Sequence, residues 1–209
     1  MSITPASQER ERLESFAVTT SLLTPRPAPT GPRPVLWTCA EFHRLGDAGV
    51  FEGRRAMLIG GVILEEGPMN PPHAVTLELV EAAVRAAFGA GCRIRGQSPL
   101  VLGQDLDPEP DLAVVAGVPR GSTGHPTTAV LVVEVADSSL AFDTHEKRLL
   151  YARAGIPDYW VVDVNARRLL VYRDSQAGDY ATQQVVGSAG TVSPLAMPAA
   201  VVRVADLLL

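Results

Sequence analysis

The chain has 209 residues, a length typical of one domain, and 46 % of them are hydrophobic, which is enough for a sizeable core. Its formal net charge of −5 argues against a protein that grips nucleic acid over a large surface, but it leaves room for a local arginine-lined groove. We find no apolar run of the roughly 18 to 20 residues that cross a membrane and no secretory signal, and the two cysteines lack metal-ligand spacing, so we expect a reduced, cytoplasmic protein.

Residues 1–34 are expected to form a flexible arm, because five prolines between positions 25 and 34 favour extended conformations. A single domain is expected over 35–209. It opens with a short helix that ends near Gly46, for which Thr38 and Glu41 have the spacing of a capping box. Two apolar runs, 54–59 and 62–66, flank a Gly-Gly pair and predict a β-hairpin.

An apolar stripe predicts a helix over 74–88, and we place His73 in a loop or first turn, with a site role as the alternative. Further elements are expected in this order: strands at 93–102, 111–117 and 130–135, a helix opened by Asp143, strands at 159–164 and 169–172, an edge strand at 182–186 and a helical turn at 204–208. This order predicts an α/β fold with a mixed central sheet flanked by helices.

Glu134 is the only polar side chain in the apolar run 130–135, which is typical of a strand buried on both faces. A lone buried charge costs several kcal/mol unless something compensates it. Asp111 begins the preceding strand, and because adjacent strands lie about 4.8 Å apart, a divalent cation between the two carboxylates would remove their repulsion. The alternative is that Asp111 caps a turn after Pro110 and Glu134 pairs with a core arginine.

Lys147 is the only lysine of the chain, the other 17 cationic side chains being arginine. It lies on the helix for which Asp143 and Glu146 have capping-box spacing. With a metal ion at the carboxylates, an ammonium could orient or deprotonate a water molecule whose pKa the metal lowers. The alternative is an i,i+4 salt bridge to Asp143 on a solvated helix face.

Several segments over roughly 51–172 resemble the Uma-two family of bacterial endonucleases, which is placed in the PD-(D/E)XK superfamily. They read PEPDLAVV at 108–115, VVEVADSS at 132–139 and YARAGIPDYWVVD at 151–163, with the Lys147 helix between the last two. The resemblance implies a restriction-endonuclease-like core with an N-terminal β-hairpin. It also implies Mg²⁺ (or Mn²⁺) at Asp111 and Glu134, with the carbonyl of Val135 as a further ligand.

The resemblance also assigns catalytic positions. The superfamily's usual lysine position, two residues after the glutamate, holds Ala136, and Lys147 matches a lysine displaced to the following helix. Gln97 resembles a family position beside the active site. Family hairpins often read Glu-Leu-Ile-Asp-Gly. The corresponding segment 57–61 reads Met-Leu-Ile-Gly-Gly here and lacks the expected acid, for which the candidate substitutes are Glu52, Glu65 and Glu78.

The expected function is therefore that of a metal-dependent endonuclease that hydrolyses DNA phosphodiester bonds, and a homodimer is expected by analogy with restriction-type nucleases. The alternative is an inactive nuclease-fold module that binds nucleic acid or a protein partner, which the acidic charge and the missing hairpin acid favour. A Ser or Cys hydrolase lacks any recognisable nucleophile motif. The candidate phosphate contacts are Arg54, Arg55, Arg93, Arg95, Arg167 and Arg168.

Overall fold

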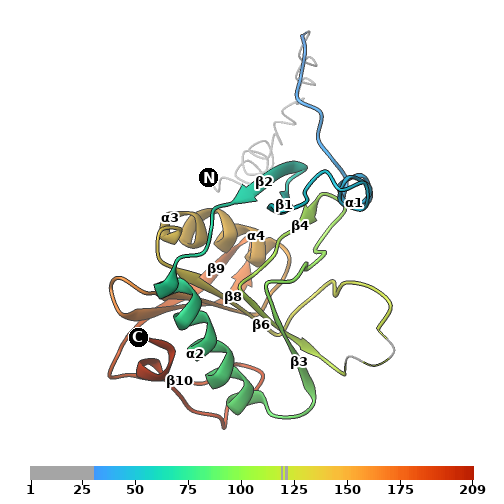
Figure 1. The fold of residues 1–209 in the computed structure, drawn as a ribbon. Helices are drawn as coiled ribbons and strands as arrows, with labels where there is room; N and C mark the ends of the chain where they lie inside the picture. The colour runs from blue at the N-terminus through green and yellow to red at the C-terminus, as the bar shows by residue number, and fades with distance from the viewer. Residues whose placement is uncertain (1–30, 119, 121) are drawn as a thin grey trace, which may run out of the picture. The chain divides into compact units, whose positions relative to one another are not determined.

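A mixed β-sheet forms the centre of the computed structural model, which describes residues 31–118, 120 and 122–209 (Figure 1). Within these residues the sheet has six strands in the order β3-β5-β6-β7-β8-β9, of which only β6 and β7 pair in parallel. The strands are β3 (Cys92–Gly96), β5 (Leu112–Ala116), β6 (Leu131–Ala136), β7 (Asp158–Asp163), β8 (Arg168–Gln176) and β9 (Asp179–Gly187). The predicted α/β fold with a mixed sheet is confirmed.

Helices cover both faces of this sheet (Figure 1). One face packs against α2 (Pro71–Phe88) and a C-terminal 3-10 turn, η2 (Val204–Leu207). The other face packs against the crossover from β6 to β7, which consists of α3 (Leu140–Phe142), a π-helical turn η1 (Asp143–Lys147) and α4 (Arg148–Arg153).

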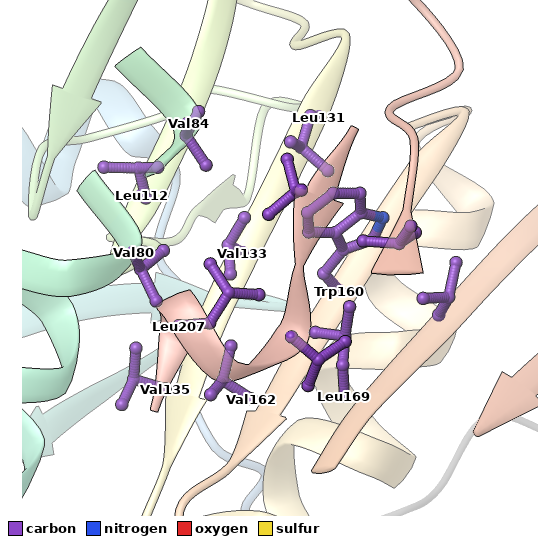
Figure 2. Packing of buried hydrophobic residues seen from close by; sticks show 14 of the residues in the cluster. Val80, Val84, Leu112, Leu131, Val133, Val135, Trp160, Val162, Leu169 and Leu207 are labelled. Carbon is purple, nitrogen blue, oxygen red and sulfur yellow. The ribbon is translucent and has the colours of Figure 1, made fainter. Parts of the chain in front are cut away.

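Alternation along the central strands divides the core into two layers. On β6, Leu131, Val133 and Val135 belong to the layer under α2, while Val132 and Ala136 belong to the layer under α4. Figure 2 shows the first layer, in which side chains of α2 and η2 close over those of the strands. Glu134 has the parity of the α4 layer, so the strand itself directs its carboxylate toward the crossover helix.

The predicted hairpin is confirmed as β1 (Arg55–Ile59) and β2 (Val62–Glu66), joined by a turn in which Gly60 and Gly61 have φ of 58° and 76°. Two successive positive φ angles are what a two-residue hairpin turn requires and what glycine adopts without strain. With β4 (Leu106–Asp107) the hairpin forms a second sheet, and β10 (Thr191–Val192) pairs with β11 (Val202–Arg203) in a third. Helix α1 (Cys39–Asp47) has the predicted capping box.

Two boundaries of elements near the site differ from the prediction. Helix α2 begins at Pro71 rather than 74, because the Asn70 side chain caps it by accepting the His73 N–H at 3.0 Å, and proline suits the first turn. Strand β3 ends at Gly96 rather than 102, because Gln97 leaves the extended conformation at φ 44°. The edge strand and the final helical turn are confirmed as β9 and η2.

The predicted capping box at Asp143 is wrong. The helical segment already begins at Leu140, and Asp143 lies inside it, 1 % exposed, as the first residue of the π-helical turn. Its carboxylate accepts a hydrogen bond from the Ser139 hydroxyl instead of capping a helix.

Residues 36–209 form one compact unit, whereas most of the predicted arm 1–34 lies outside the described residues, so its assignment stays a prediction. In the part of the chain that the structure describes, no helix combines the length and apolar character needed to cross a bilayer.

Candidate active site

The three residues singled out from the sequence meet in one cavity of about 380 Å³. Asp111, Glu134 and Lys147 all line it, with 7 %, 1 % and 4 % of their surfaces exposed. The other lining residues come from the hairpin, the start of α2 and the crossover: Arg55, Met57, Leu64, Glu65, Glu66, Gly67, Pro68, Met69, Asn70, His73, Asp137, Ser138, Ser139, Phe142 and Asp143.

Strand register brings the two carboxylates together. Leu112 of β5 pairs with Val133 of β6, and one further step in this antiparallel register places Asp111 opposite Glu134. The Asp111 N–H donates to Glu134 Oε2 at 3.3 Å, and the Val135 N–H donates to Asp111 Oδ2 at 2.9 Å. Asp111 therefore forms hydrogen bonds across the pair of strands, and not only within a turn after Pro110.

Lys147 reaches this point from the π-helical turn. Its Nζ lies 2.9 Å from Glu134 Oε2, 3.5 Å from Asp143 Oδ1 and 3.9 Å from Glu66 Oε1. The partner of Glu134 is therefore this lysine and not a core arginine. The i,i+4 pair with Asp143 does form, but on a buried face rather than a solvated one. π-helical turns are frequent at functional sites, and this one aims both residues inward.

Two further side chains complete the hydrogen bonding of the carboxylates. His73, in the first turn of α2, places Nε2 3.1 Å from Asp111 Oδ1, which supports the site role that the sequence left as an alternative. Tyr151 of α4, fully buried, donates its hydroxyl to Glu134 Oε1 at 2.8 Å. Each oxygen of Asp111 and of Glu134 therefore has a protein donor.

Burial and charge act in opposite directions on these groups. Burial raises the pKa of Glu134, and it raises that of Asp143 in the same way. Burial opposes ionisation of Asp111 too, but the hydrogen bond and charge of His73 outweigh it and lower the pKa of Asp111. The pKa of Lys147 is raised, because the attraction of Glu134 and the other carboxylates outweighs the burial that would lower it.

Some residues of the site gave no clear signal in the sequence. Glu66 ends β2, lies in the cavity and pairs with Arg55 at 2.6 Å, but its neighbour Glu65 carries the same side chain, so spacing could not choose between them. Tyr151 lies within the family-like segment 151–163 without any feature that marks its hydroxyl. Of the candidate substitutes for the missing hairpin acid, Glu65 lines the cavity, while Glu52 and Glu78 are not among its lining residues.

Gln97 contributes its backbone rather than a cavity-lining side chain. Its N–H donates to the Asp111 carbonyl at 3.1 Å, and its side-chain nitrogen is buried without a hydrogen-bond partner among the described residues. A catalytic role for Gln97, like ligation by the Val135 carbonyl, stays a prediction. Among the six arginines considered for phosphate contact, Arg55 is the one that lines the cavity.

The donors in the cavity suit a hard divalent cation. Three buried carboxyl groups, those of Asp111, Glu134 and Asp143, lie within reach of Lys147 and His73, so oxygen donors are concentrated at one point of the cavity. The described residues contain no ready-made group of three or more His, Cys, Asp or Glu ligands. Mg²⁺ typically takes one or two carboxylates and completes its shell with water and phosphate oxygens, and Asp111 and Glu134 are two adjacent carboxylates.

Comparisons with known proteins show the fold and the family of this chain. A solved structure described as "a putative nuclease belonging to DUF820", from Anabaena variabilis ATCC 29413, superposes with a TM-score of 0.67 at 17 % identity, covering 83 % of this chain and 97 % of that chain. At this identity the likeness shows the fold. No protein with a curated description matches. The family model Uma2, described as "Putative restriction endonuclease", matches residues 39–205, so the chain belongs to the Uma2 family.

Proposed function

We propose that this protein is a metal-dependent endonuclease that hydrolyses phosphodiester bonds in DNA. The observation that carries this proposal is the convergence of Asp111, Glu134 and Lys147 in one cavity from two strands and a separate helical turn. Chemistry of this class needs oxygen ligands and a cation beside the reacting phosphate. Membership of the Uma2 family supports the same reaction.

Some side chains of the site would bind the metal ion, and others would orient the water or the phosphate. Asp111 and Glu134 would hold the divalent cation, which when bound supplies an acidified water and neutralises charge on the phosphate. The ammonium of Lys147 would bind a phosphate oxygen or orient the attacking water. His73 and Tyr151 fix the outer oxygens of the two carboxylates, as supporting groups of metal ligands do. Attack of the water on phosphorus would form a new P–O bond as the bond to the leaving oxygen breaks. The attacking water would lose a proton to solvent, and the leaving oxygen would take one up from solvent.

A second candidate is an inactive module that keeps the nuclease fold for binding. The observation that favours it is Met57, which occupies the hairpin position where an acid was expected and lines the cavity with a thioether instead. The pairing of every oxygen of Asp111 and Glu134 with a protein donor also allows a cavity stable without metal.

Cleavage of supercoiled plasmid in Mg²⁺ or Mn²⁺ tests the proposal. We expect nicked or linear product that disappears in EDTA, and a rate at least about 100-fold lower for Glu134→Gln, because losing a ligand costs more than losing its supporting partner. Glu81→Gln removes a half-buried carboxylate that pairs with Arg85 on α2 and lies outside the cavity, and it should cleave as wild type does. Equal cleavage by Glu134→Gln would refute the assignment, and absence of cleavage in every metal would favour the inactive module.

A further inference from the structure

We propose that the cavity receives an unpaired nucleotide of a single DNA strand rather than the backbone of an intact duplex. This rests on the proposed function, because it names the substrate class of the same site. Three features carry it: the depth of the reacting groups, an apolar surface beside them and a second cavity that continues the first.

The reacting groups lie too deep for a duplex that rests on the surface. Asp111, Glu134 and Lys147 are 7 %, 1 % and 4 % exposed, so a phosphate must enter the cavity to meet them. The phosphates of a duplex are flanked by stacked base pairs and by the second strand, whereas an unpaired nucleotide can turn inward from its strand. A volume of about 380 Å³ is also at the small end for ligand pockets, suited to one nucleotide.

Apolar side chains share the cavity with the charged groups. A phosphate group gains nothing from apolar contacts, whereas the flat face of a base can stack on them. Such stacking does not depend on the sequence, because every base has a flat aromatic face. The Phe142 ring centroid lies 5.9 Å from Lys147 Nζ, which places an aromatic face next to the expected phosphate position. Met69 is 38 % exposed at the same cavity, and Met57 provides apolar surface where an acid was expected. The apolar lining residues are Met57, Leu64, Pro68, Met69 and Phe142.

A neighbouring cavity of about 540 Å³ offers a path for the next nucleotide. Arg55 lines both cavities, so they adjoin at this side chain. Arg54 and the rings of Phe42 and Phe51 line the second cavity beside Arg55 and suit a flexible strand. The same cavity also carries three carboxylates, Asp47, Asp107 and Glu109, of which Asp107 is paired with His43 at 2.6 Å, so the strand is expected to follow the side that Arg54 and Arg55 form. The charge of −5 for the whole chain fits a short local contact better than a long duplex track.

Fluorescence anisotropy in EDTA tests the inference without cleavage. A labelled 12-nucleotide DNA strand and the same strand annealed as a blunt duplex are titrated with wild-type protein, and we expect the single strand to bind at least about tenfold more tightly. Phe142→Ala should weaken strand binding by about 5- to 150-fold, the range for loss of one stacked base. Phe142→Trp should keep it, and Met69→Ala should weaken it several-fold. Leu195→Ala, an exposed residue that lines neither cavity, is the matched control.

The outcomes separate this inference from the proposed function. Duplex binding as tight as strand binding, or strand binding unchanged in both Phe142→Ala and Met69→Ala, overturns the inference. Cleavage of duplex by a protein that does not bind the single strand overturns it too, but leaves the nuclease proposal standing. Strand binding that is lost in the variants, with no cleavage in any metal, supports the inference and refutes the nuclease reaction.

Discussion

Glu134 shows how a carboxylate persists in the middle of a buried strand. Tyr151 donates to one of its oxygens and Lys147 to the other, so the desolvated charge is neither unpaired nor short of hydrogen bonds. A compact ammonium can serve Glu134 and Asp143 at once, whereas the planar fork of arginine needs a matching bidentate partner. The single lysine of this arginine-rich chain therefore lies where one compact ammonium contacts two carboxyl groups.

The pair of His73 and Asp111 gives a prediction about pH. The hydrogen bond to Asp111 raises the pKa of His73, and the contacts of Asp111 lower its own pKa despite burial. Because the pKa of His73 is raised, its ionisation contributes folding stability in full at pH values below the pKa of an unfolded histidine. This contribution is lost as pH rises through the pKa of His73 in the folded protein. Because the pKa of Asp111 is lowered, its ionisation contributes folding stability at pH values above the pKa of an unfolded aspartate. This contribution is lost as pH falls through the pKa of Asp111 in the folded protein. The pair is therefore strongest at mildly acidic pH.

A two-dimensional NMR titration of the imidazole signals measures this directly. We expect a pKa for His73 above the ordinary histidine value of about 6.5, and a lower one in Asp111→Asn. His73→Gln assigns the signal. A His73 pKa that is the same in wild type and Asp111→Asn would show that the contact does not exist in solution.

Site residues could be predicted from the sequence where the composition of the chain or of a strand singled them out. Glu134 stands alone in an apolar strand, and Lys147 is unique in the chain, so both could be named from the sequence. Glu66 and Tyr151 have no such mark, because their roles depend on which way β2 and α4 direct them once packed. The site role of His73 depends on the start of α2 at Pro71, three residues earlier than the apolar stripe suggests.

At the scale of elements, the π-helical turn is the feature that assembles the site. Its wider turn holds Asp143 and Lys147 on the buried side while Thr144 bonds back to the Leu140 carbonyl at 2.6 Å. The sequence could not predict this, because Asp143 and Glu146 have the same spacing inside a helix as in a capping box. The hairpin was predictable, since Gly60-Gly61 specifies its own turn conformation.

Deleting Glu146 tests the contribution of the π-helical turn. Removing one residue converts the wide turn to an ordinary α-helical one, in which Lys147 stands three residues after Asp143 instead of four. Both residues stay on one helix face, but the Lys147 Nζ contacts with Glu134 at 2.9 Å and Asp143 at 3.5 Å change, so we expect plasmid cleavage to fall at least about tenfold with the fold retained by circular dichroism. Glu146→Ala keeps the turn length and should cleave normally. Full activity in the deletion would mean that the turn does not position the site.

At the scale of the whole molecule, the sheet order explains why one edge of the core carries the chemistry. Antiparallel β5 and β6 bring Asp111 to Glu134, and the parallel crossover from β6 to β7 returns over the same face with Lys147 and Tyr151. The fold class and the Uma2 family were predictable because strand patterns and family-like segments are local signals. A homodimer and a cytoplasmic location stay predictions, because they depend on surfaces and surroundings outside one chain.

Metal binding at the two carboxylates is the central claim, and calorimetric titration of Mn²⁺ into the metal-free protein measures it most directly. We expect saturable binding to wild type and to Glu81→Gln, and an affinity at least about tenfold weaker in Asp111→Asn, in which a ligand oxygen is replaced by an amide. Wild-type protein that binds no Mn²⁺, or Asp111→Asn that binds it equally well, would contradict a metal site at Asp111 and Glu134.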